Sequence, residues 1–175
     1  MPFALQPLLE GRLLRLRPLR WEDWDELFAV ASDPLIWEQH PEADRYKEEV
    51  FRRYFRGAME SGGAFLVTAV ENGRAIGSSR YHGYDEAKSE IEIGWTFLAR
   101  AYWGGSYNRE MKELMLRHAF QYVESVIFRV GPQNWRSQRA VEKIGGVREG
   151  TAFDDTGRES VVFRLTAAAF AAAFS

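Results

Sequence analysis

Cysteine is absent from this sequence of 175 residues, and no run of apolar residues is long enough to span a bilayer. The missing cysteines exclude disulfide bonds and thiolate catalysis, and they fit a reducing compartment. The most apolar segment, 165–175, is far shorter than the ~20 residues that a membrane helix needs. The N-terminal segment lacks the basic start and uninterrupted apolar core of a signal peptide. We therefore expect a cytoplasmic protein with no membrane partner.

An excess of either charge is also missing. Lys and Arg number 23 against 25 Asp and Glu, so the net charge is −2. Because nucleic-acid-binding proteins usually present a basic surface, no nucleic-acid partner is expected. The apolar fraction of 46% and the aromatic fraction of 14% exclude disorder. The length predicts a single domain over residues 1–175.

Hydrophobic spacing predicts the order β-α-α-β-β-β-α-β-α-β-β. Strands are expected over 12–19, 64–71, 74–82, 89–98, 125–132, 147–153 and 158–165, and helices over 21–32, 45–60, 107–124 and 134–145. Asn72-Gly73 is a strong hairpin signal between two of the strands. Residues 89–131 read as a βαβ crossover. We therefore predict an α+β, or mixed α/β, fold built on one sheet.

A glycine-rich turn, YWGGSYNRE (102–110), lies between the strand and the helix of this crossover. Such a turn presents free backbone N–H groups at the positive end of the helix dipole, which suits a phosphate. Gly104 and Gly105 permit close approach of the backbone to a ligand. The stretch also fits a plain turn capped by Ser106 or Asn108, because it has neither common glycine-rich phosphate-binding pattern.

Two neighbouring features favour a ligand at this turn. Gly94, inside a strand, predicts a bulge that separates this strand from its parallel neighbour and opens a cleft. Asn134 and Ser137 share one face at the start of the next helix, at the same end of the sheet. Arg136, Arg139 and Lys143 form a basic stripe that either meets a phosphate or is solvated. Local packing at Gly94 and helix capping by Asn134 are the alternatives.

Together these segments resemble the GNAT superfamily of acyl-CoA-dependent N-acetyltransferases, and most closely its RimJ/RimL-like branch. The resemblance rests on RLLRLRPLRWEDWDELFAVASDP, IGSSRY, EIGWTFLARAYWGGSYNREMKELMLRHAF and NWRSQRAVEKIGGVREG. It implies a GNAT-like fold, with one mostly antiparallel central sheet that is splayed at a parallel strand pair and flanked by helices. The family loop pattern, Gln/Arg-x-x-Gly-x-Gly/Ala, falls on 103–108. Ser106 replaces a usual glycine there, and Asn108 replaces a usual glycine or alanine.

The resemblance implies acetyl-CoA as co-substrate and no metal. Its pantetheine would lie between the splayed strands, its pyrophosphate on the backbone amides of 103–109, and its phosphates within reach of Arg139. The implied cofactor-binding residues are Phe97, Leu98, Trp103, Gly104, Gly105, Ser106, Tyr107, Asn108, Arg109, Asn134 and Arg139.

Acetyl transfer to an amine needs a base, because the free amine is mostly protonated at neutral pH. Glu92 is the candidate base acting through water, and Glu90 on the same strand face is the alternative. Either glutamate is otherwise a strand charge that faces solvent. Ser137 is expected to protonate the departing thiolate, as the resemblance implies, with Tyr102 and Tyr107 as weaker candidates.

The acceptor is expected to be a primary amine, either a protein N-terminal α-amine or a small molecule. Trp37, His40 and His82 are the candidate acceptor-binding residues, and loops 33–47 and 153–158 are the expected pocket walls. The third histidine, His118, lies on an apolar helix stripe and is expected in the core. A homodimer is an expectation of the family. The alternative function is a non-catalytic acyl-CoA-binding or regulatory module on the same fold.

Overall fold

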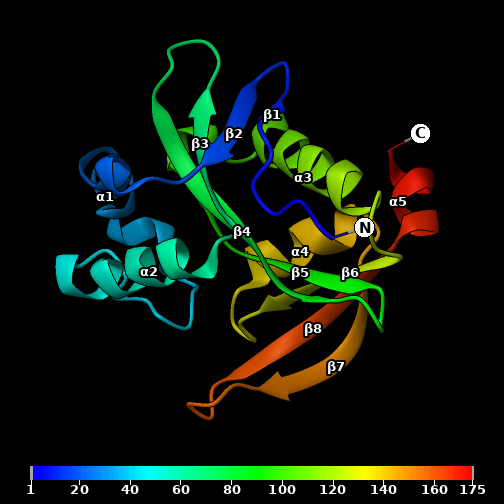
Figure 1. Cartoon of the computed structure of the whole chain (residues 1–175). Helices are drawn as coiled ribbons and strands as arrows, with labels where there is room; N and C mark the ends of the chain where they lie inside the picture. The colour runs from blue at the N-terminus through cyan, green and yellow to red at the C-terminus, as the bar shows by residue number, and fades with distance from the viewer. Residues whose placement is uncertain (1, 175) are drawn as a thin grey trace.

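Eight strands form one sheet in the computed structural model, which describes residues 2–174 (Figure 1). The strands are β1 (Leu9–Glu10), β2 (Leu14–Pro18), β3 (Ala64–Ala69), β4 (Ala75–Asp85), β5 (Glu90–Leu98), β6 (Ser125–Val130), β7 (Val147–Phe153) and β8 (Glu159–Thr166). Their spatial order is β1-β2-β3-β4-β5-β6-β8-β7. Among the described strands, β5 and β6 form the one parallel pair, so the sheet is mostly antiparallel as predicted.

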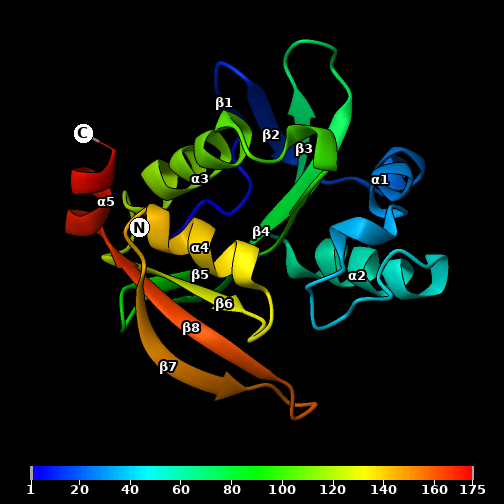
Figure 2. The ribbon, with the colours of Figure 1, turned by 180° about the vertical axis from the view of Figure 1, so that it is seen from behind.

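Helices cover both faces of the sheet. They are α1 (Trp24–Ala31), α2 (Glu48–Ser61), α3 (Ser106–Ala119), α4 (Trp135–Lys143) and α5 (Ala167–Ala173). In Figures 1 and 2, α1 and α2 lie together on one side of the molecule, away from α3, α4 and α5. Each group of helices buries its own apolar cluster against the sheet, represented by Met115 of α3 and Phe51 of α2. In the described part of the chain, no helix is long and apolar enough to cross a membrane.

The predicted element order is confirmed, with differences at the boundaries. The helix expected over 107–124 ends at Ala119, because residues 120–123 form a turn whose N–H groups bond back to α3. Val123 in this turn is buried, so the apolar spacing continues beyond the helix itself. The sequence analysis did not predict the two-residue β1 or the short helix α5.

The parallel pair separates soon after it forms. Residues 90–92 of β5 pair with 125–127 of β6, and β5 then runs on to Leu98 without that partner. The β4–β5 register shifts at this point, since Ser78 lies opposite Phe97 whereas Arg80 lies opposite Gly94. The predicted bulge is therefore present, but the left-handed residue is Trp95, with φ of 53°, and not Gly94. The buried Tyr54 of α2 donates its hydroxyl hydrogen to the Trp95 carbonyl and so holds the bulge.

Candidate functional site

A cleft of about 650 Å³ opens where β5 and β6 diverge. One wall is residues 93–98 of β5, and the other is residues 128–131 at the end of β6, followed by α4. The turn before α3 closes one end, and Ile36, Trp37 and His40 lie at its margin. The bulge and the glycine-rich turn therefore meet in one cavity, as the sequence analysis expected of Gly94.

The glycine-rich turn places the start of α3 at the cleft. Gly104 has a φ of +73°, a left-handed conformation that favours glycine, and Gly105 is the N-cap. Neither Ser106 nor Asn108 caps the helix with its side chain, so the first N–H groups of α3 have no partner from a cap. The first turn contains no acidic residue. This end of the helix is therefore suited to an anion.

The charge of the cleft lining has one sign. The lining side chains that carry charge are Arg109, Lys112, Arg129, Arg136, Arg139 and Lys143, and the described lining includes no Asp or Glu. Basic side chains beside a helix N-terminus favour a ligand with several phosphate charges.

The start of α4 forms the opposite wall of the cleft. Asn134 is 6% exposed, and its Oδ1 accepts a hydrogen bond from the Ser137 N–H at 3.4 Å, so it caps α4. Both residues also line the cleft, which means that capping and ligand contact are compatible for Asn134. Gln138 donates to the carbonyls of Gly131 and Pro132 and ties α4 to the end of β6.

Arg136 joins three parts of the site. Its guanidinium lies 3.8 Å from the centroid of a Trp103 ring and donates to the Ile36 carbonyl at 3.3 Å. The Trp103 indole N–H donates to the Leu98 carbonyl at 2.8 Å. Of the two alternatives for the basic stripe, solvation therefore does not describe Arg136, which links α4, the glycine-rich turn and the loop after α1.

Lys112 and Thr96 are cleft residues that the sequence analysis missed. Lys112 is 7% exposed, and its Nζ donates to Thr96 Oγ1 at 3.1 Å and lies 5.5 Å from the Phe128 ring centroid. Burial lowers the pKa of Lys112 to about 8. The sequence does contain a sign of the burial of Lys112. Position 112 falls on the buried stripe of α3, three residues before Met115, where an apolar side chain is usual.

Glu92 lies just outside the described cleft lining, on the face of β5 opposite the buried Ile91 and Ile93. Its side chain is 14% exposed and lies 3.7 Å from Arg129 Nε. Burial raises the pKa of Glu92 to about 7, although Arg129 and Arg80 oppose that shift. A Cβ on Gly94 would lie 3.2 Å from Glu92 Oε2, so the glycine leaves room for this carboxyl group.

Glu90, the alternative base, is already engaged. Its Oε1 lies 3.3 Å from Arg164 Nη1, and the same guanidinium binds Glu149 at 2.8 Å. Both carboxyl groups have an arginine partner, and Glu90 is the more closely paired, at 3.3 Å against 3.7 Å between Glu92 and Arg129.

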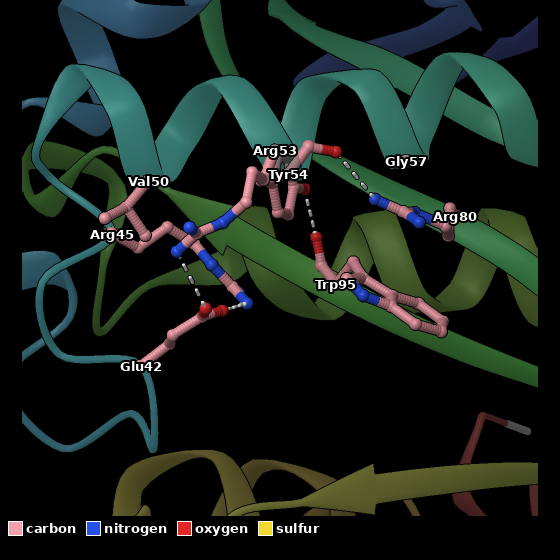
Figure 3. Close-up of a pocket in the computed structure, with 8 residues that line it drawn as sticks. All are labelled: Glu42, Arg45, Val50, Arg53, Tyr54, Gly57, Arg80 and Trp95. Atoms are coloured by element: carbon pink, nitrogen blue, oxygen red, sulfur yellow. Dashed lines mark hydrogen bonds and ion pairs between the residues drawn. The ribbon is translucent and has the colours of Figure 1, made fainter. Parts of the chain in front are cut away.

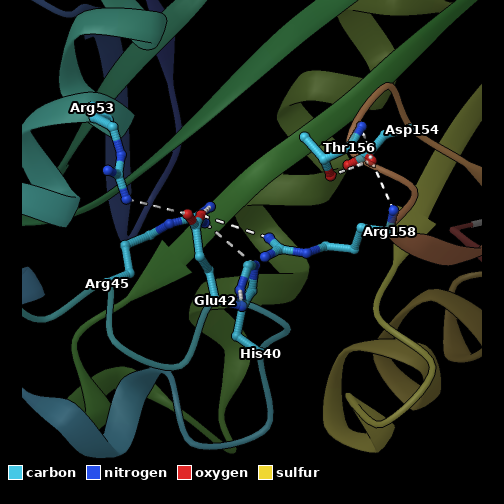
Figure 4. A network of polar contacts seen from close by, with 7 residues as sticks. All are labelled: His40, Glu42, Arg45, Arg53, Asp154, Thr156 and Arg158. Carbon is cyan, nitrogen blue, oxygen red and sulfur yellow. Dashed lines mark hydrogen bonds and ion pairs between the residues drawn. The ribbon is translucent and has the colours of Figure 1, made fainter.

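The two loops expected to wall the acceptor pocket do come together. Glu42 is the centre of a polar network in which it pairs with Arg45, with Arg53 at 4.0 Å and with Arg158 at 3.9 Å (Figure 4). Arg158 follows the β7–β8 turn, whereas Glu42 lies in the loop before α2. Asp154 accepts hydrogen bonds from Thr156 and Arg158, so its carboxylate is engaged within its own turn.

The three candidate acceptor residues occupy different positions. His40 lines the cleft, its Nδ1 accepts from the Glu42 N–H at 2.9 Å, and burial lowers its pKa to about 3, so its ring is neutral. Trp37 is buried, also lines the cleft and donates to the Ala31 carbonyl. His82 is exposed on β4, with its ring 5.1 Å from that of Trp95. His118 is buried, as expected, and bonds the Ala4 carbonyl.

The cleft gathers most of the residues that the resemblance assigned to the cofactor. Those in its lining are Phe97, Leu98, Trp103, Gly104, Gly105, Asn108, Arg109, Asn134 and Arg139. Ser106 and Tyr107 are not among the lining residues, and the Tyr107 ring packs edge-on against Tyr102.

A family model and several solved structures that are similar to this chain all point to one family. The family described as Acetyltransferase (GNAT) domain matches residues 13–147. A GCN5-related N-acetyltransferase from Brucella melitensis superposes with a TM-score of 0.83 and 22% identity over 98% of this chain and 84% of the other. A candidate acetyltransferase from T. thermophilus gives a TM-score of 0.78 and 29% identity, over 98% and 95% of the two chains.

A third similar structure is Mycobacterium smegmatis RimJ in complex with CoA-disulfide, with a TM-score of 0.70 and 18% identity over 93% of this chain and 87% of the other. At this identity the likeness concerns the fold. No curated protein matches the chain.

Proposed function

This chain belongs to the GNAT acetyltransferase family, and from that premise we propose that it transfers the acetyl group of acetyl-CoA to a primary amine. The reaction would be a direct attack of the amine in a ternary complex. The acceptor is a small-molecule amine or a protein N-terminal α-amine, and the enzyme belongs to the RimJ/RimL-like branch. The order of the sequence motifs around Trp103 and Ser137 supports that branch.

The observation that carries the proposal is the cleft between β5 and β6, which combines a basic lining with the free N-terminus of α3. The backbone amides at 104–109, with Arg109 and Arg139, would hold the pyrophosphate and phosphate groups. The β5 backbone at Phe97 and Leu98, together with Asn134, would hold the pantetheine. Ser106 and Asn108 are compatible with this arrangement. The contacts would be made by backbone amides, and every residue type except proline has a backbone N–H.

Acetyl-CoA supplies an activated acetyl group as a thioester. Glu92 would take a proton from the acceptor amine through a water molecule, and a pKa of about 7 suits a base that works near neutral pH. Trp95, the left-handed residue of the bulge, and Thr96 line the cleft, where a backbone N–H would polarise the thioester carbonyl. Ser137, whose N–H is held by Asn134, would return a proton to the departing sulfur. Positioning of two substrates in one cleft supplies much of the acceleration.

The test combines calorimetry with CoA and an acceptor screen. We expect CoA to bind, and we expect thiol release from acetyl-CoA to depend on an added amine, with the acetylated product identified by mass spectrometry. Binding without turnover across a broad panel of peptides and small amines would instead favour the non-catalytic module. Absence of CoA binding would contradict both functions.

A further inference from the structure

A second, smaller pocket of about 180 Å³ adjoins the cleft on the α2 side of the sheet (Figure 3). Its lining is Glu42, Arg45, Val50, Arg53, Tyr54, Gly57, Arg80 and Trp95. Trp95, the left-handed residue of the bulge, lines both cavities, so the small pocket lies beside the point where β5 and β6 separate. This is the side of the sheet on which Glu92 lies, because Arg80 and His82 of β4 face Gly94 and Glu92 of β5 in the register.

Arg80 carries a buried charge with few partners. It is 6% exposed, and its Nε has no hydrogen-bond partner. One terminal nitrogen donates to the Tyr54 carbonyl at 3.3 Å, and the guanidinium carbon lies 4.4 Å from the centroid of a Trp95 ring. Within residues 2–174, no ion pair joins Arg80 to a carboxylate.

The carboxylates near Arg80 are bound elsewhere. Glu42 is shared by Arg45 and Arg53 inside the pocket. Glu92 has its ion pair with Arg129 and interacts with Arg80 only at longer range. The pocket lining therefore carries three guanidinium groups against the one carboxylate of Glu42, and Arg80 is the one of the three that has no ion pair among the described residues.

A buried guanidinium without a counterion is unfavourable, because it has lost its hydration and gained little in return. An anion in the pocket would offset that loss through charge-assisted hydrogen bonds to the free Nε. One uncompensated guanidinium matches one monoanion, and the planar fork of arginine fits a carboxylate. Gly57 of α2 lies beside the group, since a Cβ there would be in ordinary contact with Arg80 Nη1, at 3.7 Å.

We propose that the acceptor is an amine that also carries a carboxylate, and that Arg80 binds this carboxylate in the small pocket while the amine faces Glu92 and the cleft. The inference rests on the proposed function and narrows its substrate class. A free amino acid and a peptide whose second residue is aspartate both carry an amine and a nearby carboxylate. The experiment distinguishes between these two kinds of acceptor.

The first arm measures binding without turnover. With CoA at saturation, N-acetylated amino acids and their carboxamides are titrated by calorimetry as product mimics, together with acetylated peptides whose second residue is Asp or Asn. We expect the free acids to bind at least ~10-fold more tightly than the carboxamides, the range of a charge-assisted hydrogen bond. If the Asp peptide binds more tightly than every amino acid, the carboxylate that Arg80 binds belongs to a peptide acceptor. Equal binding of acids and amides would overturn the proposal.

The second arm uses Arg80→Met, which keeps most of the side-chain volume and removes the charge. We expect KM for carboxylate acceptors to rise ~10-fold or more, with KM for acetyl-CoA nearly unchanged. Because the variant removes a buried uncompensated charge, its melting temperature should equal or exceed that of the wild type. Arg56→Gln removes one positive charge from the exposed face of α2 and should leave KM for these acceptors unchanged.

Two outcomes would contradict this assignment. If Arg80→Met lowers the turnover of carboxylate acceptors and of simple amines equally, or if it unfolds the chain, Arg80 has a structural role. If CoA binds and only amines without a carboxylate are acetylated, the proposed function stands and the acceptor class assigned to Arg80 is wrong. Failure of CoA to bind would instead remove the proposed function.

Discussion

At the scale of single residues, the buried carboxyl group of Glu92 determines how the rate should depend on pH. Since burial raises the pKa of Glu92 to about 7, the carboxylate that is proposed to act as base forms as the pH rises through that value. We expect kcat at saturating substrates to rise through pH 7, and Glu92→Gln to lower kcat by ~10²–10⁴-fold and to abolish this rise. Glu90→Gln is the matched control. A Glu92→Gln profile that keeps its shape would exclude this residue as the base.

The same carboxyl group should make the free energy of unfolding fall as the pH rises. Its folded pKa of about 7 exceeds its ordinary value of 4.5, so the folded state holds the proton more tightly than the unfolded state. The stabilisation that the folded state gains from this tighter proton binding is complete below about pH 4.5 and is lost as the pH rises through about 7. At pH 8, we therefore expect Glu92→Gln to increase the free energy of unfolding by roughly 1–3 kcal/mol, measured by urea denaturation. A variant that is less stable than the wild type at pH 8 would contradict the burial argument.

Ser137 provides a separate test of the leaving-group step. Because its hydroxyl is proposed to act on the departing sulfur, Ser137→Ala should lower kcat by ~10-fold or more with little change in CoA affinity. Ser137→Thr retains a hydroxyl and should keep more of the turnover. Equal kcat values for the wild type and Ser137→Ala would remove Ser137 from the mechanism. A weakened CoA affinity alone would assign it to binding.

At the scale of elements, Glu110 joins α3 to the turn between β1 and β2. Its carboxylate accepts hydrogen bonds from the backbone N–H groups of Arg12, Leu13 and Leu14, at 2.9, 2.8 and 2.9 Å. A Cβ on Gly11 would lie 2.6 Å from Glu110 Oε2, which explains the glycine in this turn. The contact holds the helix that presents the proposed phosphate site against the edge of the sheet.

Loss of this contact should be measurable. We expect Glu110→Ala to lower the free energy of unfolding by about 2–3 kcal/mol, because it leaves backbone donors without their charged acceptor. Glu113→Ala is the control on the same helix. Within residues 2–174, the one ion pair of Glu113 is a partly exposed pair with Arg117 at 3.7 Å, so this variant should change stability by less than about 0.5 kcal/mol. Similar losses in both variants, measured by urea denaturation, would contradict the anchoring role.

At the scale of the whole molecule, the proposed cofactor spans both halves of the sheet. The cleft is bounded by β5 and the glycine-rich turn on one side and by β6 and α4 on the other. A ligand that binds only the folded chain at 100 times its Kd adds about 2.7 kcal/mol to the free energy of unfolding. For a chain of this length, CoA should therefore raise Tm by roughly 5–10 °C.

The control for that measurement is pantetheine, which lacks the pyrophosphate and the 3′-phosphoadenosine of CoA. It should raise Tm much less at the same concentration, because it cannot occupy the amides and basic side chains at the start of α3. An equal shift with both compounds would mean that the glycine-rich turn does not bind phosphate.

The sequence by itself determined the element order and the location of the cleft. These follow from local patterns: alternation in β5, glycines before α3 and an apolar stripe along it. Glu92 and Asn134 could be placed near the cleft for the same reason, because each lies a fixed number of residues from a recognisable turn or strand end. The role predicted for Ser137 came from the resemblance to the family.

The tertiary structure alone decided which charges are buried and what compensates them. Arg80 belongs to a strand that was predicted correctly, yet its burial depends on Tyr54 of α2 and Trp95 of β5, which the alternation of its own strand does not reveal. The junction of Glu42 with Arg158 likewise joins two loops over 100 residues apart. Sequence periodicity shows on which face of its own helix or strand a side chain lies. Its burial and its ion pairs depend on which other elements pack against that face.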